Sequence, residues 1–463
     1  MNAAATSPAS IPLWRLLQSA AGVLRAVREG ASATPALAAV PAELRAGTQA
    51  LVFQALRHLG RAEALRAHLA KRPPHPAADA LLCTALALGW DAAQAPYEPF
   101  TLVNQAVEAA KRNKATTQQA NFINACLRRF LREQGDLVAA TDGLPVAQWN
   151  HPAWWIARLK KDHPAHWQEI LAANNGQPPL ALRVNARVST PQALQARMAQ
   201  AGIESIPSGA HGLILAQPRP VHELPGWDEG ALSVQDAAAQ LAAPLLLEGI
   251  AGQGVAKPGI LDEDSQEPPK KLRILDPCAA PGGKTAHLLE LCDAEVTALD
   301  VDPQRCERIH QTLDRLGLKA RVVAADAGEP STWWDGQPFD AILLDAPCTA
   351  SGIVRRHPDV RWLRRESDIA ALAAIQARLL ATLWPLLRPG GRMLYCTCSV
   401  FKAEGEQQIT AFVAHNTDAV LRPAPGHLLP QTVRKGSTVP DNQVRDHDGF
   451  YYALLEKQPV PRA

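Results

Sequence analysis

The sequence predicts a multidomain protein with three parts. These are an all-α helical bundle over residues 11–140, a small α+β domain over 145–228 and a C-terminal α/β domain over 229–458. The bundle is predicted because residues 11–140 show helical periodicity and no strand-like alternation. The α/β domain is predicted because strand and helix patterns alternate from Leu272 onward, which is typical of a doubly wound, mostly parallel sheet.

Amphipathic helices account for the first part. One apolar face spans residues 13–27, a second spans 44–59, and a third, more deeply buried helix is predicted around 81–88. Residues 100–111 and 118–132 predict two further helices. Short connections between such helices build a bundle.

The second part mixes strand and helix patterns. Residues 180–188 (LALRVNARV) resemble a strand, 190–201 a helix, and 213–216 (LILA) a further apolar run. Both patterns within about 80 residues predict a small α+β domain.

The third part is an α/β domain in which ligands are expected beyond the carboxyl ends of the strands. Residues 249–271, near its start, are rich in Gly, Pro and charge and are predicted to form a flexible insertion loop. Helices are expected at 303–316 and 367–387. The expected strands are 272–276, 295–300, 320–326, 339–345, 391–398 and 450–457.

Composition excludes several protein classes. Among 463 residues, 47% are hydrophobic and 20% charged, which fits globular domains and not a disordered or collagenous chain. Eight scattered cysteines without a CxxC pair predict neither a disulfide scaffold nor a metal site. The sequence shows no signal peptide and no apolar stretch of about 18 residues, so no membrane segment is expected and a reducing cytoplasm is the predicted location. The formal net charge of +2 does not by itself indicate a nucleic-acid partner.

Four predicted strands end in an acidic residue: Asp276, Asp300, Asp326 and Asp345. Aspartate often caps a following helix, but four in register at the ligand edge favour a binding role. The turn after the first strand, DPCAAPGGKT (276–285), is neither GxGxxG nor a P-loop. Its glycines allow the backbone to approach a ligand closely, and Asp300 is placed to accept hydrogen bonds from ribose hydroxyls. These features predict a cofactor that contains a nucleoside.

Cysteines follow two strand ends at the same edge. Cys348 lies in DAPCT (345–349), and Cys396 and Cys398 lie in YCTCS (395–399). Strand alternation places Cys396 on the other side from Cys398, so Cys396 is expected to be a buried structural residue. Two thiols beside a nucleoside pocket favour covalent catalysis by Cys348 and Cys398.

Together, DPCAAPGGKT, DAPCT and TCS resemble the RNA cytosine-C5 methyltransferases that use S-adenosylmethionine. The segment NFINACLRR (121–129) resembles the NusB-like domain of one subfamily, and HPAW (151–154), LRVN (182–185) and RRHPD (355–359) resemble segments that follow it. The resemblance covers nearly the whole chain and points to the 16S rRNA cytosine-C5 methyltransferase B family (RsmB, Sun or Fmu type). It implies a Rossmann-like catalytic domain.

The resemblance also implies the roles of individual residues. Cys398 is expected to attack C6 of the cytosine, and Cys348 to assist product release. In the DNA cytosine-C5 enzymes the cysteine that matches Cys348 is the nucleophile, and this alternative stays open. Asp345 and Lys284 are expected beside the base. The cofactor is expected to contact Cys278, Ala279, Ala280, Pro281, Gly282, Gly283, Lys284, Asp300, Asp326 and Asp345.

The expected partner is 16S rRNA, free or in an early small-subunit particle, with cytosine 967 as the implied target and a monomeric enzyme. The alternative is a cytosine-C5 methyltransferase that acts on another rRNA or tRNA site. A flipped base would need phosphate contacts nearby. Two other classes remain: a non-catalytic RNA-binding protein, which the intact cysteines disfavour, and a nicotinamide-dependent dehydrogenase, which the missing GxGxxG disfavours. Arginines concentrated after DAPCT predict a phosphate clamp: Arg355, Arg356, Arg361, Arg364 and Arg365.

Overall fold

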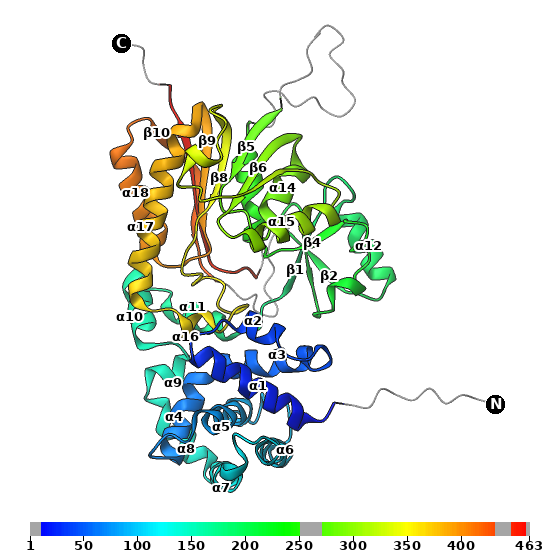
Figure 1. Cartoon of the computed structure of the whole chain (residues 1–463), viewed down its shortest axis with the longest axis vertical. Helices are drawn as coiled ribbons and strands as arrows, with labels where there is room; N and C mark the ends of the chain where they lie inside the picture. Colours follow the sequence, from blue (N-terminus) through cyan, green and yellow to red (C-terminus); the bar gives the residue numbers. More distant parts are fainter. Residues whose placement is uncertain (1–10, 251–270, 431–445, 460–463) are drawn as a thin grey trace, which may run out of the picture. The chain divides into compact units, whose positions relative to one another are not determined.

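The computed structural model describes residues 11–250, 271–430 and 446–459. The described chain forms two compact units (Figure 1). The first unit contains the chain up to Gln177 together with Val354–Glu366, and the second contains Pro178–Ile353 and the chain from Ser367 onward. The predicted insertion loop 249–271 lies almost wholly outside the described residues.

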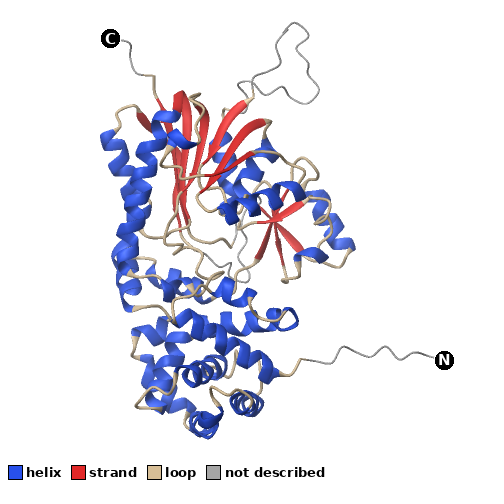
Figure 2. Ribbon diagram, in the orientation of Figure 1, coloured by secondary structure: helices blue, strands red, loops and turns tan. Residues whose placement is uncertain are grey.

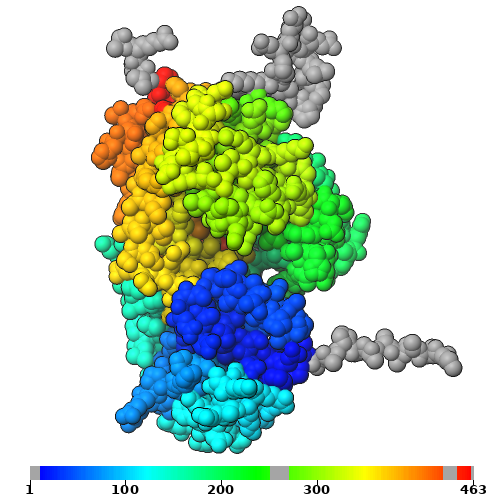
Figure 3. All heavy atoms as spheres, in the orientation of Figure 1, coloured from blue at the N-terminus to red at the C-terminus, as the bar shows by residue number. Residues whose placement is uncertain are grey.

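The described residues of the first unit form helices and no strand, which confirms the helical bundle predicted for 11–140. Figure 3 shows the atoms of its N-terminal residues, coloured from blue to cyan, packed closely against one another. Helix α5 (Pro76–Gly89) is its centre, with Leu82 and Leu86 fully buried, and it contacts α1, α3, α4, α6 and α7. Pro76 occupies the first turn of α5, where a missing N–H costs nothing. The surrounding helices are α1 (Leu13–Arg28), α2 (Ala33–Ala38), α3 (Ala42–Arg57), α4 (Leu59–Leu69), α6 (Pro99–Lys111), α7 (Ala120–Arg132), α8 (Gln134–Asp142) and α9 (Pro145–Trp149).

The boundary between the units differs from the predicted domains. Helices α10 (Ala153–Asp162) and α11 (Trp167–Asn175) belong to the first unit, although the sequence suggested that they begin the α+β domain. The segment Val354–Glu366 also belongs to the first unit. Its Asp359 accepts hydrogen bonds from the Ala33 N–H (2.9 Å) and the Ser32 hydroxyl (3.2 Å). Asp359 therefore provides an acceptor for a backbone N–H that has no partner within α2.

The described part of the second unit contains two separate sheets (Figure 2). The smaller sheet is antiparallel in the order β2-β3-β1-β4. Leu194 and Met198 of α12 pack on its buried face. The elements are β1 (Leu180–Val184), α12 (Pro191–Gln200), β2 (Ser205–Ser208), β3 (Gly212–Leu215) and β4 (Leu232–Val234).

Within the described residues, the larger sheet has seven strands in the order β10-β11-β9-β8-β5-β6-β7. The strands from β9 to β7 are parallel, and the β10–β11 and β11–β9 pairs are antiparallel. This order confirms a doubly wound Rossmann-like sheet. The strands are β5 (Leu272–Asp276), β6 (Ala294–Asp300), β7 (Arg321–Ala324), β8 (Phe339–Asp345), β9 (Leu387–Thr397), β10 (Ala419–Leu428) and β11 (Phe450–Lys457).

Helices cover both faces of this sheet. On one face, alternate residues such as Ile274 and Leu343 pack against α13, α14 and α15; on the other, Leu275 and Leu344 pack against α17 and α18 (Figure 1). Both faces are therefore apolar, which explains the continuous apolar strands in the sequence. The helices are α13 (Ala242–Leu247), α14 (Gly283–Leu291), α15 (Pro303–Arg315), α17 (Glu366–Leu383) and α18 (Glu406–His415).

Among the described residues, one helical stretch, Glu366–Leu386, has the length and apolar composition that a membrane span would need. Leu379, Leu380 and Leu383 lie in the core against the sheet. This packing accounts for the apolar character of α17.

Candidate active site

A cavity of about 380 Å³ opens beyond the carboxyl ends of β5, β6, β7 and β8. A larger groove of about 860 Å³ lies beside α12, β2 and β3, but no cysteine, histidine or basic residue lines it, so we place the chemistry in the smaller cavity. The cavity beyond the strand ends is lined by Pro277, Cys278, Ala280, Asp300, Val301, Arg305, Ala325, Asp326, Ala327, Asp345, Ala346, Pro347, Cys348, Ala350, Ile375, Arg378, Leu379 and Cys398.

Three of the four strand-end aspartates line this cavity, and each has a basic partner. Asp300 lies 3.3 Å from Arg305, on the first turns of α15. Asp326 lies 3.0 Å from Arg378 of α17. Asp345 pairs with Lys284. The sequence did not predict Arg305 and Arg378, because each reaches its partner only after its helix folds back over the strand ends.

Asp276 differs from the other three. It is fully buried and absent from the cavity wall. Its Oδ2 atom accepts a hydrogen bond from the Thr285 hydroxyl at 2.7 Å. Burial raises the pKa of this carboxyl to about 7. Asp276 therefore supports the turn that follows it and does not face the cavity.

The turn after β5 is shaped by close backbone contacts. The Ala280–Pro281 peptide bond is cis, and Gly282 has a positive φ of 96°. A Cβ atom on Gly282 would lie 3.2 Å from the Cα atom of Ile309, so glycine is required both by conformation and by space. Of the predicted cofactor residues in this turn, Cys278 and Ala280 line the cavity. Ala279, Pro281, Gly282, Gly283 and Lys284 are not on its wall.

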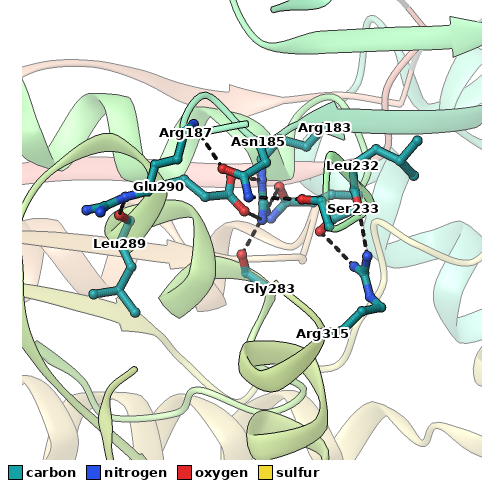
Figure 4. A network of polar contacts seen from close by, with 11 residues as sticks. Arg183, Asn185, Arg187, Leu232, Ser233, Gly283, Leu289, Glu290 and Arg315 are labelled. Atoms are coloured by element: carbon teal, nitrogen blue, oxygen red, sulfur yellow. Dashed lines mark hydrogen bonds and ion pairs between the residues drawn. The ribbon is translucent and has the colours of Figure 1, made fainter. Parts of the chain in front are cut away.

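Helix α14, which continues this turn, is held by the smaller sheet (Figure 4). The Arg183 guanidinium of β1 is fully buried and donates to both carboxylate oxygens of Glu290, at 2.9 and 2.7 Å. It also donates to the Gly283 carbonyl at 2.7 Å. Arg187 donates to the carbonyls of Leu289 and Cys292 at the other end of the helix. The two arginines therefore fix α14 along its length.

The predicted catalytic cysteines come together. The Sγ atoms of Cys348 and Cys398 lie 3.4 Å apart, and both residues line the cavity. The pKa of Cys348 is raised well above its ordinary value by the hydrogen bond with Cys398, by burial and by the nearby Glu404 carboxylate. These contacts favour the protonated form of Cys348. Cys396 is fully buried, as expected, with its Sγ atom 3.5 Å from Oδ1 of Asp345.

Lys284 and Asp345 form the closest ion pair of the site. The Lys284 Nζ atom lies 2.6 Å from Oδ2 of Asp345 and 5.4 Å from the centre of the Phe450 ring. Burial disfavours the ammonium, but the neighbouring charges, of which Asp345 contributes most, outweigh burial and raise the pKa of Lys284. The lysine is therefore a fixed cation beside Asp345, not a solvated side chain.

The predicted phosphate clamp needs correction. Arg361 is fully buried in the first unit, where its guanidinium donates to the carbonyls of Asn150 (3.0 Å) and Asn174 (2.6 Å) and to the Asn175 side chain (2.5 Å). Arg355 is also fully buried. Both guanidinium groups are enclosed by the protein, so neither is accessible to an RNA phosphate. Arg365 is exposed, and Arg356 and Arg364 are partly exposed.

Comparisons with known proteins match all three parts of the chain. Residues 265–456 match the family described as 16S rRNA methyltransferase RsmB/F, 151–222 match an RsmF/B-like ferredoxin-like domain, and 16–132 match the NusB family. The chain is 42% identical to ribosomal RNA small subunit methyltransferase B of Vibrio cholerae, over 77% of this chain and 76% of that protein. It is 38% identical to the protein of the same name from Pseudomonas putida, over 96% of this chain and 99% of that protein.

Solved structures show the same fold. The crystal structure of PH0851 has a TM-score of 0.70 at 23% identity and covers 97% of this chain and 100% of its own. A methyltransferase homolog protein from Pyrococcus horikoshii has a TM-score of 0.52 at 25% identity and covers 67% of this chain and 97% of its own.

Proposed function

The chain belongs to the ribosomal RNA small subunit methyltransferase B family of cytosine-C5 RNA methyltransferases, and we propose that it methylates cytosine 967 of 16S rRNA through a covalent bond to Cys398. One observation carries this proposal. Two thiols, 3.4 Å apart, line the same cavity as three aspartates at parallel strand ends. This arrangement supports the proposal, because a nucleoside-containing cofactor bound at the strand ends would lie beside a nucleophile.

The cavity fits S-adenosylmethionine. Its volume of about 380 Å³ falls within the range of small-molecule pockets. The Asp300 carboxylate would hold the ribose hydroxyls, and Asp326 would lie near the adenine. The turn from Cys278 to Lys284 would pass around the methionine part. When bound, the cofactor supplies an electrophilic methyl group on its sulfonium.

Asp300→Ala tests this placement. We expect the dissociation constant of S-adenosylhomocysteine to rise about 10-fold or more, as the loss of a hydrogen bond to a charged group implies. Asp293→Ala is the control, since Asp293 is exposed and pairs with Lys271 away from the cavity. Equal affinities for both variants, measured by calorimetry, would contradict the ribose contact.

Each side chain of the site has a separate role in the proposed reaction. The Cys398 thiolate adds to C6 of cytosine, the C5–C6 double bond opens, and the released electron pair is stabilised by the proton that Lys284 and Asp345 hold at the N3 and N4 edge. C5 would then bond to the methyl carbon as the S–CH₃ bond breaks, and the electron pair of that bond would return to sulfur and leave the neutral thioether S-adenosylhomocysteine. On release, the C5 proton passes to water, the C5–C6 double bond re-forms and the bond from Cys398 to C6 breaks. The Cys348 thiol donates its hydrogen bond to the departing sulfur.

RNA containing 5-fluorocytidine at the target tests the covalent step, because fluorine at C5 prevents the elimination that releases the enzyme. We expect the wild-type protein and Cys348→Ser to form a stable adduct with this RNA, and Cys398→Ser to form none. If Cys398→Ser retains turnover while Cys348→Ser loses RNA capture, the two roles are exchanged, as in the DNA enzymes.

The substrate is proposed to be free 16S rRNA or an early small-subunit particle, modified in the cytoplasm by a monomer. The relatives' names support the small-subunit rRNA as substrate. Bisulfite sequencing of rRNA from a deletion strain tests the target: we expect unmethylated cytosine 967. Persistent methylation there would contradict the assignment.

A further inference from the structure

Glu404 is a buried carboxylate that the sequence patterns did not single out. It lies in a short 3-10 turn, Lys402–Glu404, and is fully buried. Its Oε1 atom accepts hydrogen bonds from the Thr349 backbone N–H at 2.8 Å and from the Gln376 amide at 3.3 Å. Its Oε2 atom accepts hydrogen bonds from the Ser399 hydroxyl at 2.6 Å and from the Thr349 hydroxyl.

These donors lie beside the two cysteines. Thr349 directly follows Cys348, and Ser399 directly follows Cys398. The Gln376 amide also donates to the carbonyl of Pro347, the residue before Cys348, at 2.8 Å. Glu404 thus bonds to both cysteine-bearing loops.

The two loops also contact each other directly around this carboxylate. The Gly352 N–H donates to the Cys398 carbonyl at 2.9 Å. The Ser351 and Ser399 hydroxyls lie 2.9 Å apart. These contacts tie the backbones together, whereas Glu404 joins the residues that immediately follow the two thiols.

We propose that Glu404 is a positioning residue that holds the Cys348 and Cys398 loops in register and so sets the separation of the two thiols. The inference rests on the proposed function of both cysteines. It adds a residue that touches neither base nor cofactor and acts through the two loops.

Only a carboxylate suits this position. It can accept all four hydrogen bonds, whereas the amide of glutamine has one acceptor oxygen and an NH₂ group that donates. Burial raises the pKa of Glu404, but the bonds from Ser399 and Thr349 favour its ionised form. The same negative charge contributes to the raised pKa of Cys348.

Glu404→Gln tests the positioning role, and Glu406→Gln is the matched control. Glu406 lies two residues further along, is exposed and pairs with Lys402 at 3.1 Å. We expect Glu404→Gln to lower kcat about 10- to 100-fold with little change in KM for either substrate, because displaced reacting groups lose rate before affinity. Glu406→Gln should match the wild type. A kcat for Glu404→Gln within twofold of the control would overturn the proposal.

A second measurement needs neither RNA nor turnover. In a Cys398→Ser background, the rate of Cys348 alkylation by iodoacetamide is followed against pH by peptide-resolved mass spectrometry. Removal of the Glu404 charge should move the midpoint to lower pH, and Glu406→Gln should not. An unchanged midpoint would overturn the inference.

The two proposals fail in different ways. If the wild type forms no adduct with 5-fluorocytidine RNA, the proposed function fails, while the alkylation profile still reports on Glu404. If Glu404→Gln does not fold, Ser399→Ala removes one of the four hydrogen bonds without a buried charge, and we expect a smaller loss of kcat in the same direction. Unchanged kcat in Ser399→Ala would then count against the positioning role.

Discussion

The Lys284 Nζ atom lies 2.6 Å from Oδ2 of Asp345, although the two residues are 61 positions apart in the chain. Lys284 comes from the first turn of α14, and Asp345 is the last residue of β8. The pair therefore joins the turn that is proposed to surround the cofactor to the strand end that leads to Cys348.

Lys284→Met removes the ammonium that is proposed to hold a proton beside the base. We expect methyl transfer from radiolabelled S-adenosylmethionine to fall at least about 100-fold, the scale of a lost acid–base group. Lys271→Met is the control, because Lys271 is exposed and pairs with Asp293. Similar rates for the two variants would show that Lys284 is only structural.

The same lysine makes a pH prediction. Its pKa is raised above the ordinary value of 10.5, so its contribution to stability is complete below that value and is lost only as the pH rises through the higher folded pKa. Lys284 also lowers the pKa of Asp276, which is about 7, so the comparison is made in an Asp276→Asn background where this carboxyl does not titrate. Between about pH 6 and about pH 9, the difference in unfolding free energy between Asp276→Asn and Asp276→Asn/Lys284→Met should stay constant. Denaturant unfolding at several pH values measures this difference, and a steady change across that range would contradict the ion pair.

Asp276, unlike Lys284, should make the unfolding free energy depend on pH near neutrality. Its pKa is raised from 3.8 to about 7 by burial, so the folded protein binds one more proton than the unfolded chain between those values. Stability from this group is complete below pH 3.8 and is lost as the pH rises toward and through about 7. Asp345 and Lys284 also act on this carboxyl, with opposite signs.

Asp276→Asn removes the titration and keeps an oxygen for the Thr285 hydroxyl. Relative to the variant, the wild type should lose unfolding free energy between pH 5 and pH 8, by roughly a few kcal/mol in all. Equal pH profiles of the two proteins in denaturant unfolding would show that Asp276 is ionised throughout.

Arg183→Met and Arg197→Met compare the loss of a buried ion pair with the loss of an exposed one. Loss of Arg183 leaves Glu290 buried without its partner, and we expect unfolding free energy to fall by about 3 kcal/mol or more. Affinity for S-adenosylhomocysteine should also weaken, because Arg183 holds the Gly283 carbonyl. Arg197→Met, which breaks the exposed pair with Glu229, should change the unfolding free energy far less and leave affinity unchanged. Equal effects of the two variants would contradict the role of Arg183.

The arginines after Cys348 should fall into two groups. Arg361→Met should destabilise the first unit, because three oxygen acceptors, two of them in fully buried hydrogen bonds, lose their donor. Replacement of Arg356, Arg364 and Arg365 by Gln should weaken RNA binding and flatten its salt dependence, with cofactor affinity intact. If filter binding at several salt concentrations shows no change for the triple variant, these arginines do not contact RNA.

Much of the fold and site could be predicted because it depends on local pattern. The strand ends at Asp276, Asp300 and Asp345 follow apolar runs that are buried on both faces, and register at one sheet edge then brings Cys348 and Cys398 together. Strand β10 was not predicted, because Pro423, Pro425 and Gly426 interrupt its pattern and its order comes from pairing with β11.

What could not be predicted depends on contacts between distant parts of the chain. A run of arginines after DAPCT predicts a charged surface, but Arg361 is buried and donates hydrogen bonds to Asn150, Asn174 and Asn175. No local sequence pattern shows that these asparagines lie next to Arg361. Glu404 was missed for the same reason, since Thr349 lies 55 positions away.

The central claim is that Cys398 forms the bond to cytosine and Cys348 assists its release. Mass spectrometry of the adduct between Cys348→Ser and 16S rRNA carrying unmodified cytosine tests it most directly, since this variant is expected to stall before release. We predict that the RNA is attached to the peptide that contains Cys398, with a methylated cytosine. Attachment at any other residue, or efficient turnover by Cys398→Ser, would contradict the account.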